Sequence, residues 1–334
     1  MTQILVVDPL SKSALLSLQT FGAGLTYAPE LRSELLVEAA RETEILVVRD
    51  TAVDVAAMDA APSLALIVQA GARLNTIDIN AATQRGIYVA NCPGKDASAV
   101  AELVIGLLIA ADRNIVTATN DLRAGDWKSK TYPNGMGLAG RTIGIVGFGA
   151  AGQAVAAAAR GLGMDVVAWS RTLTPKKAMI HNVGFCATPN ELAHRADVVS
   201  VHLAANAATY HFVDRRFLQQ MHDGAYLINT SRGELVDSSA LKEAIRRKGL
   251  RVALDVFENE PTEENGVFAD TELASMIIAT PHLGASTRQA IEEISREVIR
   301  VIGAFIASGI PSNVVNAPAD RSSLFTSDGF EYAY

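Results

Sequence analysis

Cysteine is scarce in this sequence of 334 residues. Only two are present, Cys92 and Cys186, and they lie far apart in no metal-binding or redox spacing. This composition excludes a disulfide scaffold and favours a reducing, cytoplasmic location. The HExxH, CxxC and GxSxG motifs are also missing, so no metal site and no nucleophilic hydrolase site is predicted.

Positive charge and long apolar runs are scarce as well. Lys and Arg number 29 against 36 Asp and Glu, which gives a net charge of −7. Nucleic acid and anionic membrane surfaces attract clustered positive charge, so neither is expected as a partner. The most apolar stretch, residues 103–111, is far shorter than the ~20 residues of a membrane helix. The run from Ile4 to Asp8 lacks a preceding basic residue, and we interpret it as a first strand and not as a signal peptide.

Short β-branched runs alternate with helix-period segments along the chain. Ten strands are predicted, at residues 4–8, 45–49, 64–69, 87–91, 142–147, 165–169, 197–201, 225–229, 251–255 and 276–280. Such alternation, with several strands apolar on both faces, predicts parallel sheets covered by helices. Ten strands exceed one comfortable open sheet. We therefore predict an α/β fold with two doubly wound parallel-sheet domains.

The two predicted domains are joined by residues 100–115, in which apolar residues recur at the spacing of one helix face. Asp96 is a suitable N-cap and Gly125 a suitable stop, which predicts one connecting helix. A second amphipathic segment, residues 286–306, is predicted to return the chain to the first domain. The predicted domains are residues 1–96 with 287–334, and residues 97–286; a polar tail is expected after about Asn316.

A glycine-rich turn follows the predicted strand at 142–147, and an alanine-rich helical segment follows the turn. The turn is Gly147-Phe148-Gly149-Ala150-Ala151-Gly152. In this strand–turn–helix context the pattern predicts a dinucleotide-phosphate site. Gly147 permits the tight turn, Gly149 admits the pyrophosphate, and Gly152 allows close helix–strand packing, while the helix N-terminus offers unpaired N–H groups. An ordinary strand-to-helix turn is the alternative.

Polar residues follow the last three predicted strands, on the side of the glycine-rich turn. They are Arg232, then Asp255, Glu258 and Glu260, and then His282. Ligands bind beyond the carboxyl ends of parallel strands. A guanidinium can hold a carboxylate and a histidine can donate a proton near neutrality, which suits hydride transfer to a keto acid. As alternatives, Arg232 is a surface ion-pair partner and both glutamates are solvated loop charges. The histidines expected in helix-like segments with structural roles are His181, His194, His211 and His222.

With these motifs in this order, residues 45–316 resemble the D-isomer-specific 2-hydroxyacid dehydrogenase family, which includes phosphoglycerate, glyoxylate/hydroxypyruvate and D-lactate dehydrogenases. The motifs that carry the resemblance are Gly147–Gly152, Val201-His202-Leu203, Ile228–Gly233, Ala253–Pro261 and Thr280–Gly284. The resemblance implies a Rossmann cofactor domain inserted in a flavodoxin-like substrate domain, and a homodimer built on the connecting helix.

The resemblance also implies roles for single residues. His282 is the acid/base, Glu260 supports it, Arg232 orients the substrate, and Asp255 holds the nicotinamide carboxamide. The remaining residues implied to contact the cofactor are His202 and Thr230, and those implied to contact the substrate are Gly71, Ala72 and Arg73.

Two positions depart from the family pattern. Arg73 stands where the family often has the second glycine of a Gly-x-Gly turn, and it either recognises a second anionic group or points to solvent. The loop after Leu203 lacks the proline-containing run that is common in the family.

The end of the strand at 165–169 favours NADP over NAD. A carboxylate about 20 residues beyond the glycine motif would bond the ribose 2′-OH of NAD, whereas an arginine accommodates the 2′-phosphate of NADP. This strand runs into Ser170, Arg171 and Thr172, with no acid. In the alternative, Arg171 is solvated and NAD binds through Ser170 alone.

The predicted function is an NAD(P)-dependent oxidoreductase that interconverts a small 2-keto acid and its D-2-hydroxy acid. D-3-phosphoglycerate dehydrogenase is one alternative. Another is a dinucleotide-sensing, corepressor-like binding protein, because such relatives can keep the arginine, glutamate and histidine. A formate-type dehydrogenase is disfavoured, since it would pair glutamine with the histidine where this chain has Glu260.

Overall fold

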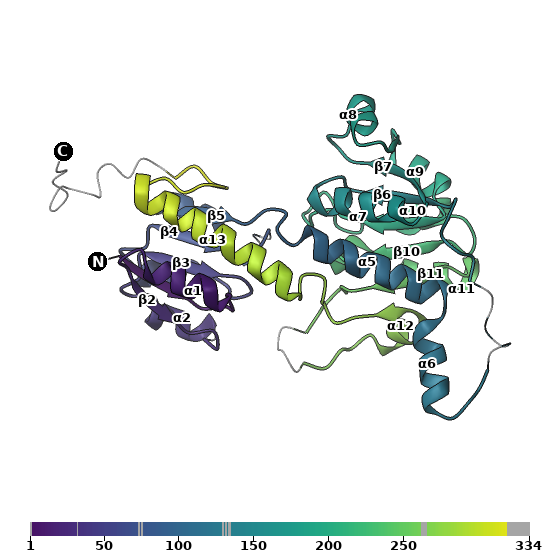
Figure 1. Cartoon of the computed structure of the whole chain (residues 1–334), viewed down its shortest axis with the longest axis horizontal. Coiled ribbons are helices and arrows are strands. Elements are labelled where there is room, and N and C mark those ends of the chain that lie inside the picture. Colours follow the sequence, from purple (N-terminus) through teal and green to yellow (C-terminus); the bar gives the residue numbers. More distant parts are fainter. Residues whose placement is uncertain are drawn as a thin grey trace. The chain divides into compact units, whose positions relative to one another are not determined.

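The chain folds into two compact α/β units (Figure 1). A computed structural model describes residues 2–31, 33–72, 74, 76–128, 130, 132, 135–261 and 266–318. Unit 1 comprises Met1–Asp96 with Thr287–Tyr334, and unit 2 comprises Ala97–Ser286. Each unit is built on a parallel sheet, with five strands in unit 1 and seven in unit 2 among the described residues, which confirms the predicted fold class.

Unit 1 has the strand order β2-β1-β3-β4-β5. Its strands are β1 (Gln3–Val6), β2 (Gly24–Tyr27), β3 (Ile45–Val48), β4 (Leu66–Gln69) and β5 (Tyr88–Asn91). Its helices are α1 (Lys12–Gln19), α2 (Ser33–Ala39), α3 (Val55–Ala60), α4 (Ile79–Gln84) and α13 (Arg288–Ser308). One sheet face packs against α1 and α13, and the other against α2, α3 and α4. The last helix therefore completes the core begun by the first strands.

Unit 2 has the strand order β12-β11-β10-β9-β6-β7-β8. Its strands are β6 (Thr142–Val146), β7 (Asp165–Trp169), β8 (Gly184–Phe185), β9 (Val198–Val201), β10 (Tyr226–Asn229), β11 (Arg251–Leu254) and β12 (Ile278–Ala279). The chain runs outward from β6 to β8 and then returns to β9 on the other side of β6. This reversal is a topological switch point, where open α/β sheets bind ligands.

Unit 2 also contains helices, most of which cover the two faces of its sheet. They are α5 (Ala97–Asp112), α6 (Ile115–Arg123), α7 (Ala150–Gly161), α8 (Pro175–Ile180), α9 (Pro189–Arg195), α10 (Arg215–Gln220), α11 (Ser238–Lys248) and α12 (Thr271–Met276). Side chains of α5, α7 and α8 pack on one face, and those of α9 to α12 pack on the other. The strands between them are apolar on both faces, as a doubly covered parallel sheet requires. No helix in the described part of the chain is long and apolar enough to cross a membrane.

Three expectations about local structure were wrong. Two strands were missed: β2, whose residues are only partly buried, and β8, which has two residues. The connecting helix is two helices, because Asn114 adopts a left-handed conformation (φ 52°) between α5 and α6. His181, His211 and His222 lie outside helices, His181 as the C-cap of α8 and His211 in a turn with φ 50°.

Candidate active site

The glycine-rich turn joins β6 to the N-terminus of α7. Gly147 has φ 95°, and a β-carbon there would lie 2.3 Å from the carbonyl oxygen of His202. A β-carbon at Gly152 would lie 2.2 Å from the carbonyl oxygen of Gly147. At Gly149, the N-cap of α7, a β-carbon would meet nothing within 4 Å, and no side chain caps the helix. The outer glycines are thus needed for packing, while the middle one leaves open space beside a helix N-terminus that can bind a phosphate.

Two buried polar atoms at the switch point lack partners within the described chain. His202 follows β9, and its Nε2 lies 2.8 Å from Ser200 Oγ, while its Nδ1 has no hydrogen-bond partner. Thr230 follows β10, and its Oγ1 is also unpaired. Burial lowers the pKa of His202 to about 4, so the ring is neutral at physiological pH. Buried polar atoms are nearly always satisfied, so these two fit a polar ligand beside the glycine-rich turn. The residues present therefore fit a bound dinucleotide.

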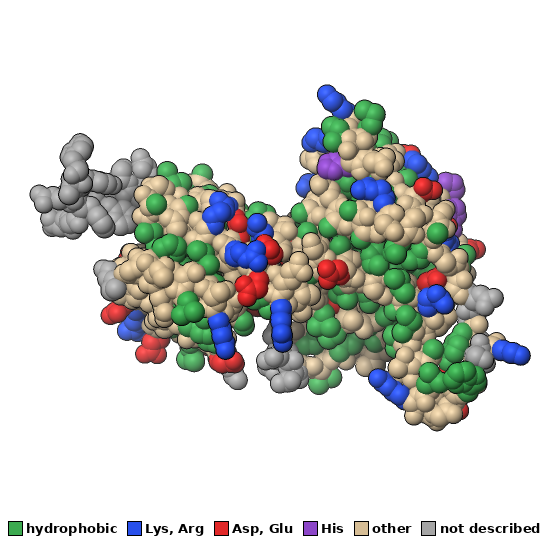
Figure 2. All heavy atoms as spheres, in the orientation of Figure 1, with side chains coloured by type: hydrophobic (Ala, Val, Ile, Leu, Met, Phe, Trp, Pro, Cys, Tyr) green, Lys and Arg blue, Asp and Glu red, His purple; other side chains and the backbone are tan. Residues whose placement is uncertain are grey.

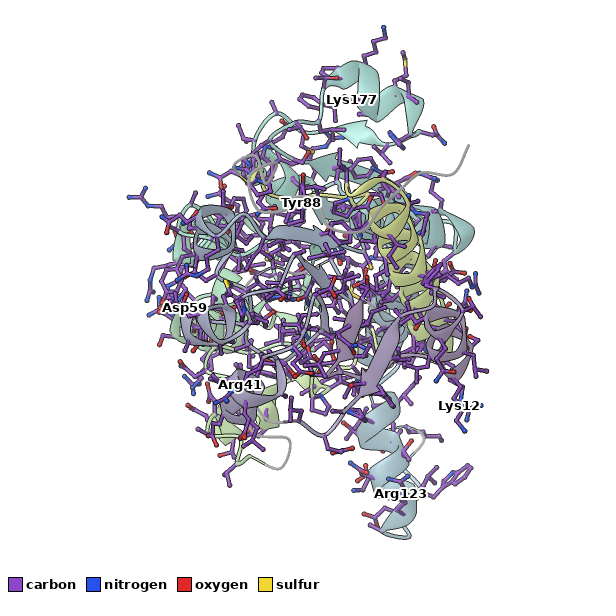
Figure 3. All side chains as sticks on the ribbon, turned by 90° about the vertical axis from the view of Figure 1, so that its left-hand side faces the viewer. Lys12, Arg41, Asp59, Tyr88, Arg123 and Lys177 are labelled. Carbon is purple, nitrogen blue, oxygen red and sulfur yellow. The ribbon has the colours of Figure 1, made fainter. Side chains whose placement is uncertain are left out.

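The loop after β7 carries positive charge. Ser170 Oγ accepts the N–H of Leu173 at 3.1 Å and shapes the turn, and Arg171 is exposed without an ion pair in the described structure. Lys177, labelled in Figure 3, lies on α8. Its ammonium donates to the carbonyl of Thr172 at 3.4 Å. Residues 166–190 contain no Asp or Glu.

Asp255 anchors the loop that bears His282. Its buried carboxylate follows β11, where Oδ1 accepts the Thr280 hydroxyl at 2.5 Å and the N–H of Leu283 at 2.7 Å. Oδ2 accepts the N–H of Gly284 at 2.8 Å, and the backbone carbonyl accepts the N–H of His282 at 2.8 Å. These four hydrogen bonds hold the His282 backbone in a left-handed conformation with φ 56°. The implied contact of Asp255 with a carboxamide stays a prediction.

His282 and Glu260 form a hydrogen-bonded pair. Nδ1 of His282 lies 2.7 Å from Oε2 of Glu260, and Oε1 of Glu260 accepts the N–H of Phe257 at 2.8 Å. Burial alone would raise the pKa of Glu260, but the bonds from His282 and Phe257, with the charge of Arg232, hold it below its ordinary value. The ionised carboxylate accepts the Nδ1 hydrogen, so Nε2 is the ring atom that can exchange a proton.

Arg232 lies in the loop after β10. Asn229 shapes this loop, since its Nδ2 donates to the Arg232 carbonyl at 2.7 Å and its Oδ1 accepts the N–H of Ser231 at 3.0 Å. The adjacent Gly233 is pressed against the next loop, where a β-carbon would lie 1.9 Å from the carbonyl carbon of Phe257. The Arg232 guanidinium donates to the carbonyl of the neighbouring Ser231. Gly233, the next residue, lies against the backbone of Phe257 and Glu258, so the loop of Arg232 adjoins the loop that bears Glu260, the partner of His282.

A cavity of about 480 Å³ opens beside the His282–Glu260 pair, within unit 2. Phe257 and Phe268, in edge-to-face contact with ring centroids 4.7 Å apart, form part of its wall. The site therefore has an apolar neighbourhood, in which charged interactions are stronger than in water.

The implied substrate residues belong to unit 1. Gly71 and Ala72 follow β4, and their carbonyls accept the N–H of Cys92 at 2.9 Å and the Asn91 side chain at 3.1 Å. Arg73 lies outside the described residues, so both interpretations of it stay predictions.

Sequence reasoning missed a second histidine–glutamate pair. His211 Nε2 lies 2.6 Å from Glu258 Oε1, although the two residues are 47 positions apart. Glu258 is therefore not a solvated loop charge. The only hint in the sequence was the closeness of Glu258 to Glu260 on one strand-end loop.

Comparison with known families agrees with the dinucleotide site that the geometry indicates. Residues 105–284 match the model for "D-isomer specific 2-hydroxyacid dehydrogenase, NAD binding domain". The chain belongs to this family. The match confirms the resemblance and a domain that binds a nicotinamide dinucleotide. Among the described residues, no group of three or more His, Cys, Asp or Glu side chains could hold a metal ion.

Relatives in this family have several recorded activities. A glyoxylate reductase from Thermococcus litoralis is 39% identical over 298 residues, covering 86% of this chain and 88% of the relative. A D-3-phosphoglycerate dehydrogenase from Methanocaldococcus jannaschii is 36% identical over 320 residues, covering 95% of this chain but 60% of the relative. The chain thus spans about three fifths of that dehydrogenase. The structure of an NADPH-dependent glyoxylate/hydroxypyruvate reductase from Sinorhizobium meliloti, with NADP and malonate, has a TM-score of 0.79 and 26% identity, covering 94% of this chain and 96% of that one.

Proposed function

We propose that the protein is an NAD(P)-dependent oxidoreductase that interconverts a small 2-keto acid and its D-2-hydroxy acid. The observation that carries the proposal is the grouping of Arg232 with the Glu260–His282 pair at the carboxyl ends of β10 to β12. The three groups stand on the same sheet edge as the glycine-rich turn, where a dinucleotide would lie.

The roles follow from the chemistry of each group. When bound, the nicotinamide supplies or accepts the hydride. Arg232 pairs with the substrate carboxylate through its planar fork of donors and stabilises charge on the neighbouring oxygen. Glu260 accepts the Nδ1 hydrogen of His282 and fixes the orientation of its ring. His282 then donates a proton from Nε2 to the keto oxygen in reduction and takes it back in oxidation.

The test is turnover of the purified full chain with NADH and NADPH on glyoxylate, hydroxypyruvate, pyruvate, phosphohydroxypyruvate and bulkier 2-keto acids. Reduction of at least one of these supports the proposal. A marked preference for phosphohydroxypyruvate would support the phosphoglycerate alternative, which the relative from M. jannaschii motivates. Dinucleotide binding without turnover of any acid would favour the corepressor-like alternative.

NADP is the proposed preferred cofactor. Arg171 and Lys177 bring positive charge to the end of β7, and no carboxylate in residues 166–190 would repel a 2′-phosphate. Arg171→Ala should weaken NADPH binding much more than NADH binding in fluorescence titrations. Met179→Ala, at an exposed position of α8, is a control for general damage to this region. A clear preference of the unmutated enzyme for NADH would contradict the proposal.

A homodimer is also proposed. Three apolar side chains of α6 are well exposed, namely Ile115 at 46%, Val116 at 47% and Leu122 at 57%, and Figure 2 shows hydrophobic side chains at the surface near this helix. The resemblance implies contact between subunits near this helix. Light scattering at micromolar concentration should give twice the chain mass of 35.3 kDa, and a monomer would refute the assignment. The cytoplasmic location is likewise proposed, on the low cysteine count.

A further inference from the structure

The Glu258 side chain links three loops of unit 2. It follows β11, two positions before Glu260, and 19% of its side chain is exposed. Oε1 lies 2.6 Å from Nε2 of His211, in the loop after β9, and Oε2 accepts the N–H of Ser238 at 3.1 Å, in the segment after β10. One carboxylate therefore joins segments that follow three neighbouring strands.

Several donors keep this carboxylate ionised. Burial raises the pKa of Glu258, but the hydrogen bonds from Ser238 and His211 outweigh it and leave the pKa below its ordinary value. Ser238 is the first residue of the 11-residue helix α11, so the carboxylate also lies at the positive end of a helix dipole. The Tyr210 ring stacks on His211 with centroids 4.0 Å apart, and the N–H of His211 donates to the Glu234 carbonyl at 2.8 Å. Both members of the pair are thus held on more than one side.

The linked loops are those that bear the proposed catalytic groups. Arg232 lies between β10 and Ser238, and Glu260 lies two residues after Glu258. The N–H of Phe257, the residue before Glu258, donates to Glu260 Oε1 at 2.8 Å, so the orientation of Glu260 depends on the backbone at this point. Gly233 presses on that same backbone. A shift of the loop at Glu258 would move Glu260 relative to both Arg232 and His282.

We propose that His211 and Glu258 are positioning residues, which set the Glu260–His282 pair against Arg232. This inference rests on the proposed function. The pair acts through Glu260 and touches no reacting atom. A displacement of about 1 Å in an active site can cost about 10²-fold in rate, so loss of the pair should lower the rate of the reaction.

The variants are Glu258→Ala, His211→Ala and His211→Gln, with Glu191→Ala as the matched control. Glu191 makes the same kinds of contact on α9, where it accepts the N–H of Ala187 at 2.8 Å and pairs with Arg195 at 3.1 Å. We expect Glu258→Ala and His211→Ala to lower kcat about 10- to 100-fold. The KM for the dinucleotide should stay within about twofold, since the glycine-rich turn is untouched. Glu191→Ala should leave kcat unchanged.

Two further measurements separate positioning from folding. His211→Gln keeps an N–H donor that can reach Glu258, so it should restore most of the kcat lost in His211→Ala. In a Glu260→Ala background, Glu258→Ala should cause little further loss, because the group it positions is already gone. An undiminished loss of kcat when Glu258→Ala is added to Glu260→Ala would overturn the inference. So would a folded Glu258→Ala enzyme that is as active as Glu191→Ala.

Failure of the proposed function would be detected by a different measurement from failure of the positioning role. If the wild-type chain reduces none of the keto acids, that function fails, and the inference is tested by NMR of the His282 ring, assigned with His282→Ala. Glu258→Ala and His211→Ala should change the chemical shifts of the His282 ring, whereas Glu191→Ala should not. Unchanged ring signals in folded Glu258→Ala protein would overturn the positioning role independently of turnover.

Discussion

The buried carboxylate of Glu297 should be a main electrostatic contributor to the stability of unit 1. It lies on α13, with 6% of the residue exposed. Its Oε1 accepts hydrogen bonds from Arg300 Nε at 3.1 Å and from Asn313 Nδ2 at 2.6 Å, and its Oε2 lies 3.3 Å from Lys95 Nζ. Asn313 also donates to the Asn91 carbonyl at the end of β5. The carboxylate thus joins the last helix, the C-terminal segment and the residues after β5.

The expected effect of Glu297→Gln follows from the pKa of this group. The Arg300 hydrogen bond is the largest cause that lowers this pKa from 4.5 to about 2, with further bonds from Asn313 and Lys95 outweighing burial. One pKa unit corresponds to about 1.4 kcal/mol, so the ionised form contributes about 3 kcal/mol to folding. Because the pKa is depressed, this contribution is present above about pH 4.5 and is lost as the pH falls toward 2.

The cysteines provide an assay that reports on each unit separately. Cys92 lies in unit 1 and Cys186 in unit 2, and both side chains are fully buried. Burial raises the pKa of Cys92 to about 12, so its thiol should react only after unfolding. Pulsed thiol labelling across a urea gradient, with peptide mass spectrometry, gives a free energy of unfolding at each cysteine.

At pH 7, Glu297→Gln should lower the free energy of unfolding measured at Cys92 by about 2–3 kcal/mol. Urea unfolding followed by circular dichroism, which needs no thiolate, should show this difference shrinking toward zero near pH 2. Glu293→Gln is the control, because Glu293 makes an equivalent contact with Arg296, at 2.7 Å, on the exposed side of the same helix. Glu293→Gln should lower the free energy of unfolding by only a few tenths of a kcal/mol. A loss below about 0.5 kcal/mol for Glu297→Gln, or a loss equal at pH 7 and pH 3, would refute the reasoning.

Three further predictions concern the site in unit 2. His282→Ala should lower kcat about 10²–10⁴-fold with dinucleotide affinity unchanged by calorimetry, and near-normal turnover would remove it from the mechanism. Arg232→Ala should reduce kcat/KM for the keto acid, and an unchanged kcat/KM would contradict its substrate role. Gly149→Ala should fold with a normal Tm yet bind dinucleotide weakly, whereas Gly152→Ala should lower the Tm, because its β-carbon would lie 2.2 Å from a carbonyl oxygen. Equal Tm values for the two glycine variants would contradict this division of roles.

The architecture was largely predictable because the strands of a doubly covered sheet are continuous apolar runs. β3, β4, β9 and β10 are buried at every position, and each was predicted within two residues of its ends. Such continuous apolar runs are absent from the edge strands β2 and β8. β2 has no buried residue, and β8 has only two residues, so neither carries the apolar run by which strands are identified in a sequence.

The break between α5 and α6 shows a different limit. The apolar periodicity continues across it, since Ile115 keeps the phase of the stripe on α5. The chain nevertheless turns at Asn114, whose left-handed conformation is one that asparagine adopts more readily than most residues. No side chain on α6 is then fully buried. Periodicity alone cannot distinguish one helix from two helices of the same phase.

The loop after β11 shows why part of the site could not be predicted. Glu258 and Glu260 have similar sequence surroundings, but Asn259 between them has φ 56°, which turns the chain and directs the two side chains to different histidines. Each partner lies far away in the sequence, at His211 and His282. The motif therefore identifies which groups follow the strand, whereas the backbone conformation decides which histidine each glutamate pairs with.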